Sequence, residues 1–315
     1  MTVFIVRRLI VLIPVLFGIS LLTFVAMHLI PGDMATLLIG PDGIQDPEVL
    51  AAIRAKYGLD QPLIVQYFAW LRNVVQGDFG MSLRLGVPVL EEIMRRLPLT
   101  IELALAALAI ALVLGGSVGL LAGTVGGAWR WVAQVLAIGG TAVPNYFLAT
   151  LFILYGQRVI PWIPTLEYAS FSDDPIQHLK SLIYPSIALG MGLSAVIAEN
   201  TRASMMEVKQ QDYVRVARAK GLSERSVRLR HVLRNGLIPI ITVTGLQAGY
   251  LLGGTIITET VFALPGLGRL ALSAATLRDY PMMQGIVIVI ATMVLLTNLL
   301  ADVAYSLADP RIRVN

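Results

Sequence analysis

The sequence contains no cysteine, only three histidines and no Gly-Lys pair among its 315 residues. Without cysteine, the protein forms neither disulfide bonds nor thiolate metal sites, so packing alone holds its parts together. His28, His178 and His231 lie far apart in the sequence, and we therefore expect no metal centre. A Walker A loop, which cradles the phosphates of ATP, needs a Gly-Lys pair, so this chain has no such loop.

Charged residues are also scarce. They make up 14% of the chain, and hydrophobic residues make up 56%, whereas an ordinary soluble domain is roughly 25% charged. A helix of about 20 apolar residues crosses a hydrocarbon core of ~30 Å. Six apolar stretches reach or approach that length, near residues 9–30, 99–123, 132–155, 183–199, 237–258 and 285–305. The sequence therefore predicts an all-α, multi-pass membrane protein with six transmembrane helices, of which the short fourth, containing Pro185, is the weakest.

The distribution of Lys and Arg predicts the orientation, because cytoplasmic loops carry an excess of both. The side that holds the basic segment 200–235 would also hold Arg7, Arg8, Arg130, Arg311 and Arg313. We therefore expect both termini in the cytoplasm. The first apolar stretch is too long for the core of a signal peptide and no A-x-A cleavage site follows it, so we expect an uncleaved first helix.

The sequence divides into four parts on this basis: an N-terminal transmembrane helix at 1–30, an external segment at 31–98, a five-helix core at 99–308 and a cytoplasmic tail at 309–315. Within the external segment, Asp46-Pro47-Glu48 predicts a helix start and Gly58 its end. A second amphipathic helix is expected before Gly77. The segment is either a small packed cap or a surface that meets substrate.

Two predicted membrane helices carry glycines at spacings of four. Each glycine costs about 1 kcal/mol relative to alanine in a helix in water, so such ladders indicate a compensating use. One face of small residues lets another backbone approach closely. The interpretation that we favour is static packing within the chain, and the alternative is a face that slides against a partner. The glycines are Gly115, Gly119, Gly123 and Gly127 in the second helix, and Gly245, Gly249 and Gly253 in the fifth.

Acidic residues in the membrane stretches are functional candidates, since a charge at the bilayer centre costs about 3 kcal/mol. Glu102, Glu199, Glu259 and Asp302 all fall near predicted helix ends. No chain of carboxylates crosses the membrane, which argues against a proton-coupled carrier. Sodium coupling through backbone carbonyls stays open.

The basic segment 200–235 has an internal order beyond its charge. Apolar residues recur at helical spacing up to Ala217, Gly221 breaks the pattern, and Ser223 with Glu224 predicts the start of a new helix. A helix, a glycine turn and a second helix form a shape that fits a groove on another protein. The simpler alternative is a topology signal on anionic lipid. The nine basic residues are Arg202, Lys209, Arg215, Arg218, Lys220, Arg225, Arg228, Arg230 and Arg234.

This segment resembles the cytoplasmic coupling loop of binding-protein-dependent ABC importers, in which Glu-Ala-Ala, three residues and Gly mark the helix that docks on the ATPase. Ala217 and Gly221 match that pattern, while Arg215 and Val216 replace its first two positions. The usual Leu-Pro is replaced by Leu233-Arg234. These departures are typical of the dipeptide, oligopeptide, glutathione and nickel permease branch.

Further motifs over almost the whole chain are similar to the first of the two paired permeases of that branch. They are "IPGD" at 30–33, "GLDQPL" at 58–63, "GDFG" at 77–80, "LGGTIITETVFALPGLGRL" at 252–270, "RDYP" at 278–281 and "DPRIR" at 309–313. The resemblance implies a type I ABC importer permease fold in a bacterial or archaeal cytoplasmic (inner) membrane.

The resemblance also implies the partners and the division of labour. A second homologous permease would complete the pore, two ATPase subunits or domains would bind ATP and Mg, and an external binding protein would deliver substrate. This chain would hold no cofactor and no catalytic residue. The residues implied for the coupling loop are Arg215, Ala217, Arg218, Lys220, Gly221 and Ser223. Asn145, Tyr146, Gln247, Thr255 and Glu259 are candidates for the pore or for packing between helices.

Small peptides are the expected cargo, followed by glutathione and then a nickel chelate. An ATP-independent secondary carrier and a membrane scaffold that binds an acidic partner are the competing function classes. Nucleic-acid binding is not expected, because basic loops beside membrane helices follow from topology alone.

Overall fold

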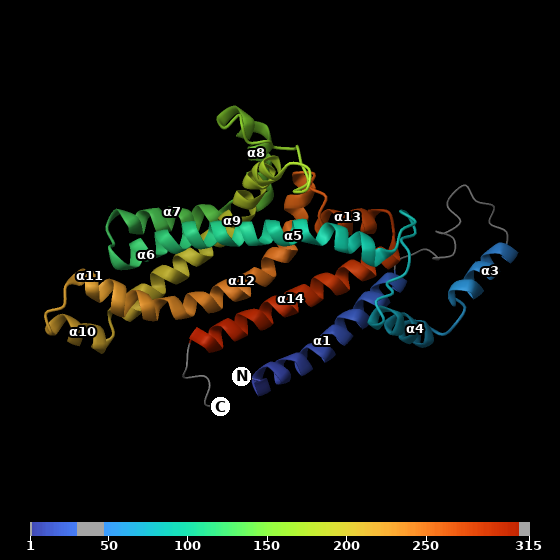
Figure 1. Cartoon of the computed structure of the whole chain (residues 1–315), viewed down its shortest axis with the longest axis horizontal. Coiled ribbons are helices and arrows are strands. Elements are labelled where there is room, and N and C mark those ends of the chain that lie inside the picture. The colour runs from blue at the N-terminus through green and yellow to red at the C-terminus, as the bar shows by residue number, and fades with distance from the viewer. Residues whose placement is uncertain (1, 30–46, 309–315) are drawn as a thin grey trace. The chain divides into compact units, whose positions relative to one another are not determined.

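The computed structural model describes residues 2–29 and 47–308, and these residues form helices joined by short loops (Figure 1). The motifs at 30–33 and 309–313, the tail, and the first part of the external segment lie outside the described residues. Within the described part no β-sheet occurs, and a single antiparallel bridge joins Met81 to Pro88. The all-α class predicted from the sequence is therefore confirmed.

The described chain forms two compact units. The larger unit contains residues 98–269 and the second half of the last helix from residue 293, and the smaller unit contains residues 6–97 and 270–292. The larger unit comprises most of the predicted five-helix core and the basic segment. The smaller unit comprises most of the first helix, the external segment and the beginning of the last helix.

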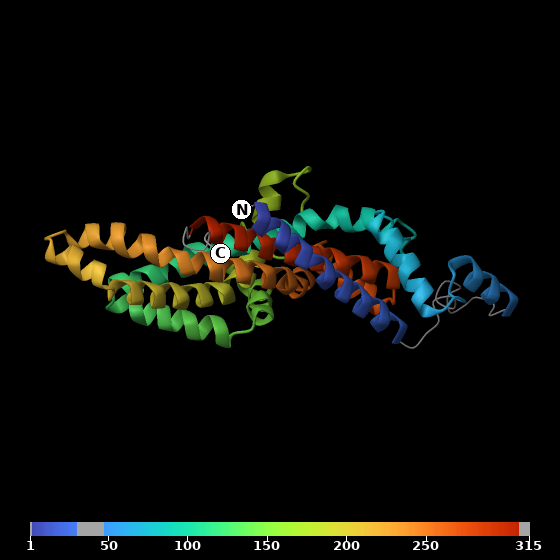
Figure 2. The same ribbon diagram turned by 90° about the horizontal axis from the view of Figure 1, so that it is seen from below.

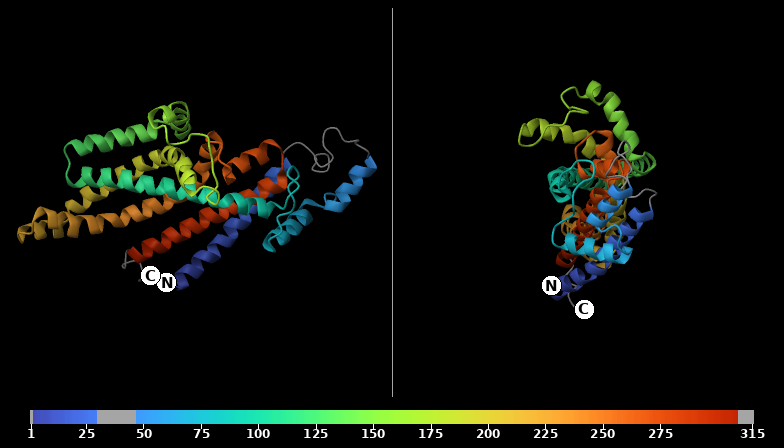
Figure 3. Two further views of the ribbon diagram at one scale, coloured as in Figure 1. Left: turned by 45° about the horizontal axis from the view of Figure 1, so that its top comes forward. Right: turned by 90° about the vertical axis from the view of Figure 1, so that its right-hand side faces the viewer.

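Among the described residues, five helices are long and apolar enough to cross a membrane, or six if one bent pair counts as a single span. The bent pair is α7 (Ala128–Ala142) and α8 (Asn145–Val159), which meet at 95°. Figure 3 shows α8 leaving the line of α7. The sequence predicted one continuous helix over 132–155, and the break follows from Pro144, which drives Val143 into an extended conformation.

The fourth predicted span, the weakest of the six in the sequence, belongs to a helix of 35 residues. Helix α9 runs from Pro175 to Lys209, whereas the sequence predicted 183–199. Asp174 begins the helix by accepting hydrogen bonds from the backbone N–H groups of Ile176 and Gln177, each at 3.0 Å. At 1.5 Å per residue, 35 residues extend for about 50 Å, so α9 is longer than a ~30 Å hydrocarbon core.

Helix α9 is the centre of the larger unit. Helices α6 (Ser117–Thr124), α7, α8 and α12 (Arg234–Val261) all pack against it (Figures 1 and 2). It is therefore buried over most of its apolar length, and small residues such as Ala188, Gly190 and Ala195 make up much of its surface. Pro185 lies inside this buried stretch. Neighbouring helices can accommodate the backbone carbonyl that proline leaves unpaired in a membrane helix.

The glycines of the second predicted helix let this helix touch the backbone of α9. Helix α5 (Val89–Ala111), the π-helical turn η1 (Leu112–Gly116) and α6 form one continuous rod. A Cβ atom built on Gly115 would lie 2.2 Å from the carbonyl oxygen of Ser194, and one on Gly119 would lie 2.4 Å from that of Ala198. At Gly123 the nearest atom would be the Cβ of Met205, at 2.6 Å. Only glycine permits these approaches.

The remaining predicted glycines divide into three kinds. A Cβ on Gly245 would lie 2.1 Å from the Cβ of Ala301 in α14 (Tyr280–Ala308), and one on Gly249 would lie 3.2 Å from the Asn298 side chain. Gly253 has no neighbour within 4 Å of that position. Gly127 does not continue the ladder, because it lies in the turn before α7 with φ +59°.

The smaller unit contains the two short helices expected in the external segment. Helix α3 spans Pro47–Tyr57 and is followed by Gly58 at φ +64°, and α4 spans Leu63–Val75, just before Gly77 at φ +85°. The Tyr67 hydroxyl lies 2.8 Å from that of Ser20 in α1 (Thr2–Leu29), which ties the segment to the first helix.

The helix that contains the second predicted span starts before the apolar stretch itself. Helix α5 begins at Val89, about ten residues before the predicted span, and continues through Pro98. Just before it, the Ser82 hydroxyl donates to the carboxylate of Asp279, which also accepts from the N–H groups of Leu83 and Met282. The motif at 278–281 thus supplies the carboxylate of one buried polar junction inside the smaller unit, and the motif at 77–80 lies just before its Ser82.

Adjacent glycines provide a matched test of the close approach to α9. Gly115→Ala forces the Ser194 backbone to move, and we expect a loss of about 1–3 kcal/mol of stability. Gly116→Ala adds a methyl group where nothing lies within 4 Å, so stability should stay unchanged or rise by up to about 1 kcal/mol. Thermal unfolding of the two purified variants in detergent measures the difference. Equal melting temperatures would contradict this account of the helix packing.

Candidate functional site

The segment between α9 and α12 is the part of the larger unit with the most distinctive local structure. Helix α10 (Asp212–Ala219) is followed by Gly221 at φ +78°, then by α11 (Glu224–Ser226) and the π-helical η2 (Val227–Leu233). Figure 2 shows α10 and α11 at the end of the unit where α9 finishes and η2 leads into α12. The helix, glycine turn and helix predicted from the sequence are present.

Gly221 makes the turn possible. Its N–H donates to the Arg218 carbonyl oxygen at 2.9 Å, and the N–H of Leu222 reaches back to the carbonyl oxygen of Ala217 at 3.4 Å. Such a helix end requires positive φ, which glycine adopts without strain. The Ser223 hydroxyl then accepts from the N–H of Ser226 at 3.4 Å and caps the next helix. The Arg218 guanidinium, 2.8 Å from the Glu224 carboxylate, links α10 to α11.

One side of the segment packs on the larger unit. Val214 and Ala217 of α10 are buried together with Val227 and Val232 of η2. They form one apolar cluster with Met205 of α9 and Ile240 of α12. The segment is therefore a rigid extension of these two long helices and not a loose loop.

The other side faces outward and mixes cations with apolar groups. Arg215 has a side chain that is 72% exposed and pairs only loosely with Asp212, at 3.4 Å. Lys220, Gly221 and Ser223 are also exposed, and Arg218 is half-buried. The exposed apolar residues are Tyr213, Val216, Leu222 and Leu229. A surface of this composition suits a protein partner better than water, because it offers both apolar area and positive charge.

The structure thus separates the predicted coupling residues into two groups. Ala217 matches the family pattern, but its side chain is buried in this chain's own cluster and positions α10. The outward groups are Arg215, Lys220, Gly221 and Ser223. Sequence reasoning did not single out Tyr213, Val216, Leu222 and Leu229 as surface residues. Because α10 is amphipathic, the positions next to its buried Val214 and Ala217 indicated its outward face, and these are Tyr213, Arg215 and Val216.

The candidates for the pore or for packing also separate. Tyr146 is exposed, whereas Asn145 and Gln247 are partly buried. Thr255 and Glu259 are completely buried within this chain, which favours the packing alternative for these two residues.

Glu259 organises the turn between α12 and α13 (Leu267–Thr276). Its carboxylate accepts a hydrogen bond from the Thr100 hydroxyl at 2.7 Å and one from the backbone N–H of Arg269 at 3.1 Å. The Thr100 hydroxyl in turn accepts from the N–H of Leu267 at 2.9 Å. A carboxylate at the start of a helix is stabilised by the free N–H groups there. A Cβ on Gly266 would lie 2.3 Å from this carboxylate, so the turn closes only around glycine.

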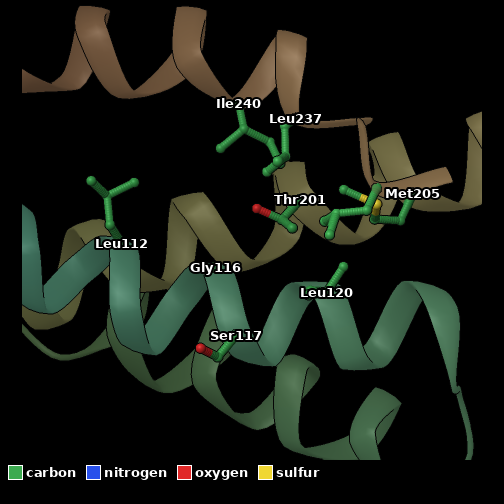
Figure 4. A pocket seen from close by; sticks show the side chains of 9 residues that line it. Leu112, Gly116, Ser117, Leu120, Thr201, Met205, Leu237 and Ile240 are labelled. Atoms are coloured by element: carbon green, nitrogen blue, oxygen red, sulfur yellow. The ribbon is translucent and has the colours of Figure 1, made fainter. Parts of the chain in front are cut away.

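A cavity of about 260 Å³ lies between the α5–α6 rod, α9 and the beginning of α12 (Figure 4). The buried hydroxyl of Thr201 points into it without a hydrogen-bond partner. No charged side chain is among its lining residues, so this cavity alone cannot neutralise a phosphate or the two termini of a peptide. The lining residues are Leu112, Gly116, Ser117, Leu120, Thr201, Met205, Leu233, Leu237 and Ile240.

Within the described residues, no group of three or more His, Asp or Glu side chains is arranged to hold a metal ion. The site that the geometry supports best is therefore the two-sided segment 210–233, with its buried face on α9 and α12 and its outward face free within this chain.

Two family models match almost the whole chain. Residues 115–314 match the binding-protein-dependent transport system inner membrane component, and residues 1–104 match the N-terminal region of such membrane components. The chain is 41% identical over 314 residues to a protein of Brucella abortus (strain 2308) named as a peptide transport system permease, with 99% of each chain covered. It is 40% identical over 315 residues to the glutathione transport system permease protein GsiC of Escherichia coli (strain K12), with 98% of each covered.

One solved structure, described as an amino acid ABC transporter with histidines, has the same fold over the core. It aligns with a TM-score of 0.51 at 19% identity and covers 70% of this chain and 94% of its own.

Two alanines on α10 test the division into a buried and an outward face. Ala217→Leu inserts three carbons at a buried position of the apolar cluster, and we expect it to lower stability by about 1–3 kcal/mol. Ala219→Leu makes the same change at an exposed position and should leave stability within about 0.5 kcal/mol. Thermal unfolding and limited proteolysis of the segment report both effects. The opposite order of stability would overturn the assigned faces.

Proposed function

Because the chain belongs to the family of binding-protein-dependent transport system inner membrane components, we propose that it is one of the two membrane-spanning subunits of an ATP-driven importer of small peptides. The observation that carries the proposal is full-length similarity, at about 40% identity, to permeases named for peptide and glutathione transport. Glutathione is itself a tripeptide, so both names describe cargo with peptide bonds, an amine and carboxylates.

In the proposed complex, the outward face of α10 and the Gly221 turn meet an ATPase subunit in the cytoplasm. Movement of that ATPase is transmitted to α9 and α12, because the buried face of the segment packs on both helices. This mechanism needs a rigid segment, and the Val214 and Ala217 contacts provide one. ATP and Mg are bound by the partner, and this chain contributes the pathway through the membrane.

The proposed topology follows the basic residues. Segment 200–235 and both termini lie in the cytoplasm, and the external segment with α3 and α4 faces the binding protein. A second, homologous permease completes the pore. Gly253 is exposed on α12 with nothing within 4 Å of its missing side chain, so a helix of that permease has room to approach closely there.

Glutathione is the second candidate cargo, and the specific observation in its favour is the GsiC similarity. A nickel chelate is a third, because a permease that passes a chelated metal needs no ligands of its own. The external binding protein is expected to select among these cargoes.

Purification from the native membrane in mild detergent tests the proposed assembly. We expect two ATPases and a second permease to accompany this chain in stoichiometric amounts, identified by mass spectrometry. In proteoliposomes with the binding protein, dipeptides and tripeptides other than glutathione should stimulate ATP hydrolysis more than glutathione or a nickel chelate. Recovery of the chain alone, with uptake driven by an ion gradient and independent of ATP, would establish a secondary carrier instead.

A pair of substitutions at Gly221 tests the coupling segment. Gly221→Val places a β-branched residue at φ +78° and should abolish substrate-stimulated ATP hydrolysis while the subunits still assemble. Gly221→Asn is the matched control, because asparagine tolerates positive φ, and it should retain most of the stimulation. Both are measured in the reconstituted complex. Normal coupling in an assembled Gly221→Val complex would contradict the role assigned to this turn.

A further inference from the structure

His178, near the start of α9, is a buried histidine whose two ring nitrogens both face oxygen atoms. Its side chain is only 3% exposed. Nδ1 lies 2.9 Å from the carbonyl oxygen of Ala169, and Nε2 lies 2.8 Å from the Glu102 carboxylate on α5. The rings of Tyr168 and Phe171 stand edge-on to the imidazole, each with its centroid 5.6 Å away. The loop 160–174 therefore folds around this one side chain.

The two contacts determine how many protons the pair holds. A carbonyl oxygen only accepts hydrogen bonds, so Nδ1 carries a proton. An ionised carboxylate also only accepts, and a neutral imidazole has one N–H, which Nδ1 already uses. The Nε2 contact therefore requires a second proton, carried by either the ring or Glu102. The pair holds one proton more than a neutral histidine beside an ionised glutamate.

Loss of this proton removes one of the two hydrogen bonds of the imidazole ring. If Nδ1 keeps its hydrogen, the lone pair of Nε2 faces carboxylate lone pairs across 2.8 Å. If the hydrogen moves to Nε2, the lone pair of Nδ1 faces the carbonyl oxygen of Ala169 across 2.9 Å. Facing lone pairs repel, and a buried polar group without a partner is destabilising.

We propose that His178 and Glu102 form a proton-binding site that fastens the loop 160–174 to α5 and to the beginning of α9. The loop is attached when the shared proton is bound and loosens when the proton leaves. This site makes no use of the coupling segment and does not depend on the nature of the cargo. With the topology proposed above, the proton would come from the external side of the membrane.

The surrounding groups are compatible with one exchangeable proton. Glu102 comes from α5, Tyr168 and Asp173 come from the loop, and Asp174 stands at the start of α9. Burial, together with the charges of Glu102 and Asp173, raises the pKa of the Tyr168 hydroxyl above its ordinary value. Tyr168 therefore stays neutral where imidazole and carboxyl groups titrate. Asp174 is held by the N–H groups of Ile176 and Gln177.

The position of the site links the loop to the rest of the larger unit. The His178 N–H donates to the carbonyl oxygen of Asp174, and the Asp174 N–H donates to that of Ser170, so loop and helix start form one hydrogen-bonded unit. Helix α9 is the element against which α6, α7, α8 and α12 pack. A change at its first turns therefore acts on the helix that organises this unit.

Hydrogen exchange of the loop amides, measured by mass spectrometry from about pH 5 to about pH 9, tests the proposal. This window brackets the ordinary titration of imidazole. After correction for intrinsic exchange rates, protection of residues 160–174 should fall severalfold as pH rises. In Glu102→Gln, the amide N–H donates to Nε2 of a neutral ring, so protection should persist without the pH response. A flat wild-type profile, or an unchanged response in Glu102→Gln, overturns the proposal.

Glu167→Gln is the matched control, because it removes a carboxylate from the same loop at an exposed position and should keep the wild-type response. If Glu102→Gln does not fold, ring ¹⁵N shifts decide in a variant whose only histidine is His178. Both nitrogens protonated at neutral pH, or one protonated beside a neutral Glu102 carboxyl seen by infrared, supports the site. A neutral ring beside an ionised Glu102 overturns it. These measurements need no ATPase, so they are independent of the importer assignment.

Discussion

The backbone of α9 and the backbone of the α5–α6 rod touch, and the larger unit depends on that contact. Side chains longer than hydrogen at Gly115 or Gly119 would overlap carbonyl oxygens of α9, because the available space is less than 2.5 Å. In a membrane the hydrophobic effect does not drive helices together, so close packing of small residues takes over that role. Helices α7, α8 and α12 also pack against α9, so this one helix contacts most of the larger unit.

Two polar centres fix the positions of helix ends, which apolar packing alone does not determine. The Glu259 carboxylate ties the α12–α13 turn to Thr100 of α5, and the His178–Glu102 pair ties the loop before α9 to the same helix. Buried polar groups specify one arrangement because leaving any of them unpaired is costly. The α5–α6 rod is thus held to α9 by its own glycines in η1 and α6, and it is held in place by the hydrogen bonds of Thr100 and Glu102 near the middle of α5.

The segment between α9 and α12 extends this rigidity beyond the packed core. Its buried valines belong to the same cluster as Met205 and Ile240, so a push on its outward face moves two long helices together. In the proposed importer this property converts a change in the ATPase into a change in the pathway. An external proton site at the first turns of α9 would act on the opposite end of the same helix, which makes α9 the common element of both inputs.

Composition and periodicity determined much of this protein in advance. The apolar stretches, the helix–glycine–helix order around Gly221 and the helix ends at Gly58 and Gly77 followed from local rules, because each depends on neighbouring residues alone. The bend at Pro144 and the length of α9 were not predicted, since a hydropathy window does not register a kink and polar residues at both ends disguised a continuous helix.

Tertiary structure alone decided which side each residue faces and what it meets. Ala217 proved to be a packing residue, while Val216 beside it lies on the surface. Glu259 is completely buried within this chain, and Thr100, more than 150 residues away in sequence, donates a hydrogen bond to its carboxylate. The sequence did not indicate a role for His178. Its proton-binding site forms only because the fold brings Glu102 and the Ala169 carbonyl oxygen to its two ring nitrogens. Long-range partners of this kind are set by the packing of helices, which local sequence does not encode.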